Sequence, residues 1–275
     1  MPEGNEKVTP AERVSRRGAA HALFALVLLA VAIRLPQMKF PLGHVAGTAV
    51  YVGERWLEGH VPYKDVWDHR GPGLYLFGGV LARRAAPLVA AAEQWLVRAF
   101  LGPEGAAVRI RPAEAVPETC RAAMMACGIA TMFVVYAFVR QWMGRMEATA
   151  AAGLCGFFSG ALVISGDCYE ALPPATLLVA VAFLAALRSR GRRPPWLLGT
   201  GVAAGAAVCF EPLAVTYVLF LALWAAGTSR DELRGLRRWV VSPVVVLAGA
   251  LVPVAAFIAY FASRGAAGGM WRCLG

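Results

Sequence analysis

The sequence contains little charge. Of its 275 residues only 16% are Asp, Glu, Lys or Arg, whereas soluble domains contain roughly 25%. Lysine occurs only at Lys7, Lys39 and Lys64, so nearly all of the positive charge is arginine. With 59% hydrophobic residues, the chain has several apolar stretches of membrane-spanning length. The composition therefore excludes a soluble enzyme and predicts an all-α polytopic membrane protein, with one transmembrane domain over residues 1–275.

Metal-binding and disulfide patterns are also missing. The six cysteines form no C-x-x-C pair, and most fall inside apolar spans, where a cysteine behaves as a small hydrophobic residue. No second histidine lies at ligand spacing from His69. The sequence therefore assigns no metal ligands and no cofactor, and a divalent cation remains an option only for the carboxylates described below.

The net charge of +10 is not the signature of a nucleic-acid-binding protein. The arginines gather at the ends of apolar spans, which is typical of cytoplasmic loops in membrane proteins and not of a nucleic-acid footprint. We therefore expect a multi-pass protein of the plasma membrane, surrounded by membrane lipids. Residues 1–18 would form a cytoplasmic tail, and the first loop, residues 35–120, would be extracytoplasmic.

The apolar pattern predicts seven membrane helices, two of them short. Both flanks of the segment 196–227 are rich in arginine, so this segment should be a helical hairpin with its apex near Glu211. Each limb would measure roughly 22 Å, which is short for a hydrocarbon core of roughly 30 Å. The expected helices are Ala19–Ile33, Ala122–Val139, Ala148–Ser165, Ala171–Leu187, the two limbs of Trp196–Gly227, and Trp239–Ala262.

The first loop should contain helices that lie on the membrane. A short surface helix is expected from Ala49 to Glu58. The stretch Leu74–Phe100 contains four charged residues, too many to span comfortably, and so predicts an interfacial helix. At the other end, a glycine-rich tail with no structure of its own should follow Ala262. The chain resembles the front part of a longer architecture.

The least ordinary segment of the chain is Tyr51–Phe77. It contains Asp65, Asp68, His69 and Arg70, followed by a Gly-Pro-Gly turn. Carboxylates can act as general bases or bind cations, and a guanidinium group suits phosphate. We therefore select Asp65 and Asp68 as candidate catalytic residues, and Arg70 with His69 as candidate phosphate-binding residues. The alternative is a solvated loop whose charges pair locally.

Other acidic residues lie between the expected spans. Asp167 and Glu170 form either a second acidic loop near the first or an ordinary polar loop. Glu211 precedes Pro212, where a helix should break. A carboxylate deep in a bilayer is usually functional, but at the apex of a hairpin it would reach water, and this second interpretation is favoured.

The segment Gly59–Pro72 resembles the first outer loop of the GT-C membrane glycosyltransferases, which include protein O-mannosyltransferases and lipid A aminoarabinose transferases. The resemblance implies the GT-C fold and transfer of a sugar from a polyprenyl-phosphate donor to a lipid, glycan or protein acceptor. Arg70 falls where the family usually has a lysine that meets the donor phosphate, and Asp68 matches the acid before it. Glu170 falls near a second-loop acid, and Glu211-Pro212 replaces a frequent Lys-Pro.

One departure from the family concerns the presumed catalytic base. Family members generally have an aspartate at the start of the outer loop, a few residues before a tyrosine like Tyr51. Here the matching stretch, residues 43–48, contains no carboxylate. Asp65 or Asp68 would then have to act as the base of an inverting transfer.

Two other functions remain open. The protein could be a truncated or degenerate transferase that binds ligands without catalysing a reaction, which the missing acid favours. It could also be a transporter, although no expected span contains a central charge pair and no inverted repeat is visible.

Overall fold

The computed structural model describes residues 10–39, 42–66, 68–107, 109–164, 172–189, 194–228 and 236–274. The regular elements in these ranges are helices, and the only β-type pairing there is a single bridge between Pro62 and Val66. This confirms the prediction of an all-α protein. Asp167 and Glu170, the second acidic loop of the sequence analysis, lie outside the described residues.

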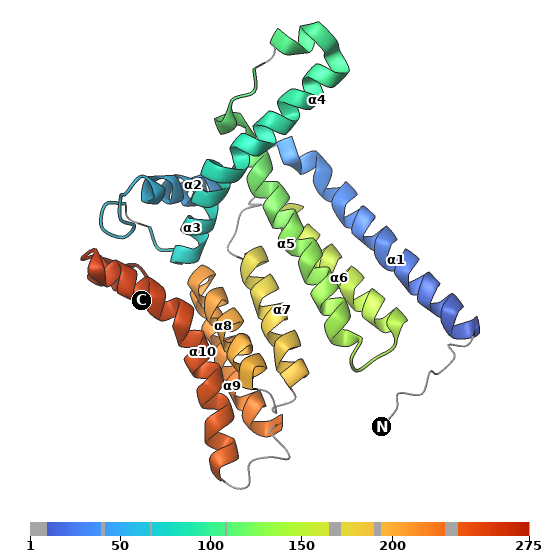
Figure 1. The fold of residues 1–275 in the computed structure, drawn as a ribbon, viewed down its shortest axis with the longest axis vertical. Coiled ribbons are helices and arrows are strands. Elements are labelled where there is room, and N and C mark those ends of the chain that lie inside the picture. The colour runs from blue at the N-terminus through green and yellow to red at the C-terminus, as the bar shows by residue number, and fades with distance from the viewer. Residues whose placement is uncertain are drawn as a thin grey trace.

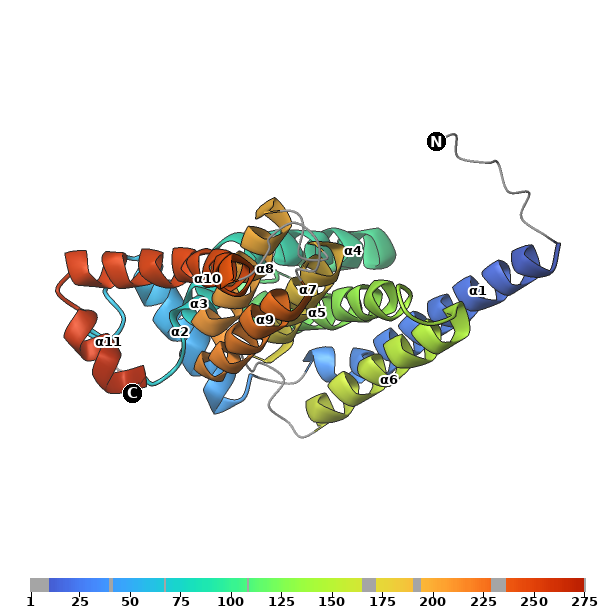
Figure 2. The ribbon, with the colours of Figure 1, turned by 90° about the horizontal axis from the view of Figure 1, so that it is seen from below.

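Seven helices form the body of the molecule, and each contains most or all of one expected membrane span, although α1 and α5 begin well before theirs. In Figure 1, α1, α5 and α6 lie on one side and α8, α9 and α10 on the other, with α7 between them. Figure 2 shows the same two groups from below. The helices are α1 (Pro10–Arg34), α5 (Val116–Val139), α6 (Arg145–Ile164), α7 (Leu172–Ser189), α8 (Pro194–Phe210), α9 (Val215–Thr228) and α10 (Leu236–Ser263).

Successive helices of this bundle run in alternating directions. The start of α1 and the turn between α5 and α6 lie at one end, whereas the end of α10 lies at the other (Figure 1). Arg140 and Arg145 flank that turn, so these arginines share an end with the start of α1. The arrangement agrees with the charge pattern of the sequence, and the side of the membrane to which each end belongs stays a prediction.

The expected hairpin of segment 196–227 is confirmed. Helix α8 ends at Phe210, the short helix η4 spans Pro212–Ala214, and α9 returns along the bundle. Glycines allow α8 and α10 to pack backbone to backbone. A Cβ atom at Gly201 or Gly205 would collide with the backbone of α10, and one at Gly249 would collide with that of α8. Small residues at helix contacts are typical of membrane proteins.

The first loop forms a cap at the end of the bundle where α10 ends, with α2 and α3 side by side and α4 projecting beyond the bundle (Figure 1). Two of its helices, α2 and α3, pack together at Gly53 and Gly79, whose backbones touch. The elements are η1 (Leu35–Lys39), α2 (His44–Leu57), α3 (Pro72–Val80), η2 (Leu81–Ala85), α4 (Ala86–Ala107) and η3 (Pro112–Ala115). The predicted surface helix over residues 49–58 is therefore α2, which begins earlier. The loop also ends earlier than residue 120, because α5 begins at Val116.

The long helix in this cap differs from its prediction. By length and composition, Pro72–Gly102 is one of four helices apolar enough to cross a membrane; the others are Pro112–Val139, Leu172–Ser189 and Val240–Ser263. By this criterion its four charged residues do not by themselves exclude a span, because an 18-residue apolar window with no more than two of them remains. Its direction differs from that of the bundle helices, since α4 crosses the end of the bundle at a steep angle (Figure 1). Its interfacial position stays a prediction.

The glycine-rich C-terminus was expected to lack structure, and that prediction was wrong. Residues Ala267–Leu274 form α11, which folds back beside the cap (Figure 2). Gly269 lies directly against the backbone carbonyl group of Tyr63, and Met270 is buried. Tertiary packing thus overrides the low helix propensity of glycine.

Candidate functional site

The loop between α2 and α3 contains the charged motif, and a tight turn shapes its first half. The backbone N–H of Tyr63 donates to the carbonyl oxygen of Val66 at 2.8 Å. The Asp65 carboxylate accepts a hydrogen bond of 2.7 Å from the backbone N–H of Val61. Asp65, a predicted catalytic residue, thus closes the turn and is not among the residues that line the cavity described below.

Two buried tyrosines hold the backbone of Arg70. The Tyr63 hydroxyl donates to the Arg70 carbonyl oxygen, and the Tyr75 hydroxyl accepts from the Arg70 N–H at 2.9 Å. The two rings lie 5.9 Å apart, and Phe261 packs edge-on against Tyr63 at 5.1 Å. Burial, and then the neighbouring Tyr75, raise the pKa of Tyr63, so its hydroxyl remains a neutral donor. Backbone groups are thereby satisfied on both sides of Arg70, and only its side chain is left to act.

Asp68 is the buried residue of the motif, and its side chain is 8% exposed. Its Oδ1 atom accepts from the His69 N–H at 2.8 Å and lies 3.1 Å from His69 Nδ1. Its Oδ2 atom lies 3.6 Å from Arg70 Nη1, an ion-pair distance that is too long for a hydrogen bond. Asp68 is therefore placed to orient His69 and Arg70 from behind.

The glycines that follow Arg70 press the loop against the apex of the α8–α9 hairpin. A Cβ atom at Gly71 would collide with the carbonyl groups of Cys209 and Phe210, and one at Gly73 would be tight against the Cys209 carbonyl group and the Phe210 ring. Phe77 of α3 also meets Phe210 edge-on at 5.9 Å. The motif of the first loop and the hairpin apex consequently share one surface.

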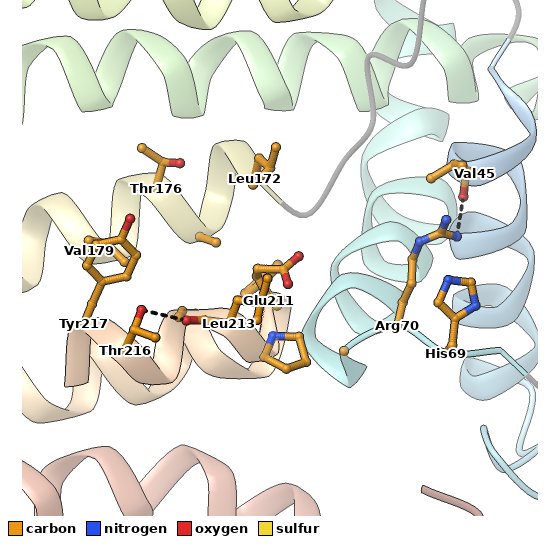
Figure 3. A pocket seen from close by; sticks show the side chains of 15 residues that line it. Val45, His69, Arg70, Leu172, Thr176, Val179, Glu211, Leu213, Thr216 and Tyr217 are labelled. Carbon is orange, nitrogen blue, oxygen red and sulfur yellow. Dashed lines mark hydrogen bonds between the residues drawn. The ribbon is translucent and has the colours of Figure 1, made fainter. Parts of the chain in front are cut away.

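A cavity of about 600 Å³ lies between these elements. One wall contains Val45 of α2 with His69 and Arg70 of the motif, and the facing walls come from the start of α7 and the hairpin apex (Figure 3). The residues of these facing walls are Leu172, Ala175, Thr176, Val179, Phe210–Ala214, Thr216 and Tyr217. The volume is in the range of small-molecule sites, which are mostly apolar with a few placed polar groups.

The polar groups of the cavity face one another across it. The Arg70 side chain is 22% exposed and the His69 side chain 68%. Arg70 Nη1 points to the carbonyl oxygen of Val45 at 3.5 Å, the outer limit for a hydrogen bond. Glu211 enters from the opposite wall, at the break between α8 and η4 (Figure 3).

The structure thus separates the predicted site residues into three groups. His69 and Arg70 line the cavity, Asp68 supports them, and Asp65 belongs to the turn. Glu211 lies at the hairpin apex, as the sequence predicts, but no sequence pattern connects it with Arg70. The only sequence signal for a role of Glu211 in the site was that Glu211-Pro212 stands where the family that the chain resembles often has Lys-Pro.

Metal binding finds no further support in the described ranges, where no group of three or more His, Cys, Asp or Glu could hold an ion. The free cysteines described do not change this, since they are dispersed over five positions, namely Cys120, Cys127, Cys155, Cys209 and Cys273.

Comparison with known proteins identifies a family. Searches of curated proteins and of solved structures found no match, whereas the profile of the family described as dolichyl-phosphate-mannose-protein mannosyltransferase matches residues 114–261. The matched segment includes α5 to α10 and the Glu211 apex, and it lies outside the Gly59–Pro72 motif, so the two resemblances are independent. Because the match covers more than half of this all-helical membrane chain, the chain belongs to the dolichyl-phosphate-mannose-protein mannosyltransferase family of membrane glycosyltransferases.

Proposed function

We propose that this protein transfers a sugar from a polyprenyl-phosphate carrier to an acceptor hydroxyl group at the outer face of the plasma membrane. The observation that carries the proposal is the cavity in which Arg70 faces apolar helix ends. A lipid phosphate needs both features at once, a cationic fork for its head and an apolar route for its chain. The family description names mannose as the sugar and protein as the acceptor, so these are the first substrates to test.

Arg70 is suited to the donor phosphate. A guanidinium group has five N–H donors, and within the described part of the chain its side-chain contacts are made through Nη1 alone. The donors on Nε and Nη2 have no hydrogen-bond partner among those residues and can bind two phosphate oxygens in parallel. His69, exposed beside Arg70, offers a further donor when protonated.

The opposite walls suit the lipid chain. Leu172 and Val179 of α7 face the cavity, as does Leu213 of the hairpin. Leu213 is 75% exposed, which is unfavourable in water but favourable where a prenyl chain or bilayer lipid covers it. The donor would lie with its phosphate at Arg70 and its prenyl chain along α7 and α9.

The remaining predicted residues take supporting roles in this proposal. Asp68 positions His69 and Arg70 and does not act as the general base. Asp65 maintains the turn. Asp167 and Glu170 remain candidate residues of the acceptor side. In the transfer, the acceptor hydroxyl oxygen attacks C1 of the sugar, and the polyprenyl phosphate leaves with its charge met by Arg70.

The test is a binding and transfer assay with labelled polyprenyl-phosphate-mannose and the full chain in lipid nanodiscs. Arg70→Ala should weaken donor binding about 10- to 100-fold, because charge-assisted hydrogen bonds contribute roughly 1.5–3 kcal/mol. Asp68→Asn should weaken it less. Arg98→Ala, an exposed arginine of α4 outside the cavity, is the matched control and should bind normally.

The competing functions give different results in the same assay. An inactive homologue would bind the donor without releasing polyprenyl phosphate. A transporter would move the labelled lipid across a liposome membrane with its sugar still attached. Normal donor binding and transfer in both Arg70→Ala and Asp68→Asn would remove the proposal.

A further inference from the structure

Glu211 is the one carboxylate among the described residues that line the cavity. Its position follows from a break in the helix. Pro212 disfavours helical backbone at the residue before it, and Glu211 is accordingly extended, with φ −135° and ψ 107°. The break turns its side chain out of the line of α8 and toward the space in front of Arg70 (Figure 3).

The backbone of Glu211 is fully occupied, while its carboxylate is not. Its N–H donates to the carbonyl oxygen of Ala207 at 2.9 Å, and its own carbonyl oxygen accepts from Ala214 at 2.9 Å. The side chain caps no helix and has no hydrogen bond or ion pair with any residue in the described ranges. The Glu211 carboxylate lines the cavity and is therefore free to meet a group of a bound ligand.

The wall opposite Glu211 offers no carboxylate to the cavity. Val45 occupies the start of α2 there, and Arg70 donates to its backbone oxygen. Asp68, the nearest acid in sequence, is buried and engaged with His69 and Arg70. Asp65 is engaged with the backbone of Val61. Of the described acids of this region, only Glu211 combines access to the cavity with a free carboxylate.

We infer that Glu211 is the general base of the transfer, acting from the wall opposite the phosphate-binding Arg70. This inference rests on the proposed function. The Glu211 carboxylate takes the proton of the acceptor hydroxyl group as the acceptor oxygen bonds to C1 of the sugar. The bond between C1 and the phosphate oxygen breaks, and its electron pair leaves with the polyprenyl phosphate. Base and leaving group then lie on opposite sides of the sugar, as an inverting displacement requires.

The separation of charges favours this division of roles. Arg70 has Asp68 as its ion-pair partner, whereas no described cation pairs with Glu211. A carboxylate paired to the guanidinium group would be a weaker proton acceptor, because a nearby positive charge stabilises its ionised form. The arrangement therefore keeps the phosphate-binding cation and the proton acceptor apart.

The experiment compares donor binding with donor turnover in one preparation. Membrane vesicles containing the full chain receive labelled polyprenyl-phosphate-mannose, and release of polyprenyl phosphate is measured with binding to the purified protein. Glu211→Gln keeps the size of the side chain and removes its basicity. It should bind the donor within about twofold of the unmutated protein and release polyprenyl phosphate at least 100-fold more slowly, since a general base contributes roughly 10²–10⁴-fold.

Two further variants complete the design. Glu211→Asp retains a carboxylate and should release polyprenyl phosphate at least tenfold faster than Glu211→Gln. Glu58→Gln changes an exposed carboxylate outside the cavity, which pairs with Arg55, and should leave the rate unchanged. Donor binding shows in each case that the variant is folded.

The inference is overturned if Glu211→Gln turns over the donor at a near-normal rate, or if it loses donor binding, which would make Glu211 a binding or structural residue. Failure of the proposed function gives a distinct result, because the unmutated protein itself would then release no polyprenyl phosphate, whether or not it binds the donor.

Discussion

The hydroxyl group of Tyr63 donates a hydrogen bond to the carbonyl oxygen of Arg70. Tyr63 has a φ of 67°, the only positive φ of a non-glycine residue in the described chain. A non-glycine residue in this conformation is unfavourable, so the surrounding contacts must hold it there. These contacts include the neighbouring rings of Tyr75 and Phe261. Gly269 of α11 also lies against the backbone of Tyr63.

The first prediction concerns this tyrosine pair. Tyr63→Phe and Tyr75→Phe each remove one hydrogen bond to the Arg70 backbone while retaining the ring, so each should cost about 1 kcal/mol of folding free energy. Donor affinity should fall about fivefold, because Arg70 is held less firmly. The measurements are thermal unfolding and donor binding in nanodiscs. Tyr51→Phe, at an exposed position, should change neither.

The second prediction tests the contact between the motif and the hairpin. Gly71→Ala places a methyl group into the carbonyl groups of Cys209 and Phe210, which cannot move without disturbing α8. Overpacking of this kind costs roughly 1–3 kcal/mol, and the displaced loop should also lose donor affinity. Gly18→Ala, where a Cβ atom meets open space, should unfold normally. Equal unfolding temperatures for the two variants would contradict the observed packing.

The third prediction concerns the contact between α8 and α10. Gly201→Val should destabilise the protein strongly, because its side chain would enter the backbone of α10 near Val246. The control is Gly199→Val in the same helix, where nothing lies within 4 Å. Unfolding in a denaturing detergent measures the difference, which should lie on the order of 1–3 kcal/mol.

The fourth prediction concerns alkaline pH. Burial raises the pKa of Tyr63 above its ordinary value, which is roughly 10 in an unfolded chain. The neutral phenol therefore contributes stability that is fully present below about pH 10 and is lost as the pH rises toward the folded pKa. The unfolding temperature of the native protein should fall above about pH 10. Tyr63→Phe, which has no proton to lose, should show a smaller decrease.

The fifth prediction tests the orientation of the molecule. In a variant without native cysteines, Lys64→Cys marks the motif loop and Gln141→Cys marks the turn between α5 and α6. Both native residues are exposed, and the two segments lie at opposite ends of the bundle (Figure 1). A membrane-impermeant maleimide applied to intact cells should label the first and spare the second. The reverse pattern would place the motif in the cytoplasm and exclude outer-face transfer.

The sequence by itself determined the bundle. Long apolar stretches must bury their backbone hydrogen bonds within the bilayer, which leaves helices as the solution for such segments. Arginines at their ends set the alternation, and Pro212 set the break between α8 and α9 because proline cannot continue the hydrogen-bonding pattern of the helix. The motif around Arg70 could also be found from the sequence, because a cluster of charged residues stands out in an apolar chain.

Only the tertiary structure decided which of these charges meet. Gly71 and Gly73 bring Arg70 against a hairpin far along the chain, and no sequence period links Arg70 with Glu211. Asp65 and Asp68 looked alike in sequence, yet one closes a turn and the other is buried behind the guanidinium group. The structure of the glycine-rich C-terminus was likewise decided by contact with Tyr63. Local propensity acts over a few residues, whereas a site in a helical bundle is assembled by packing between helices that are distant in sequence.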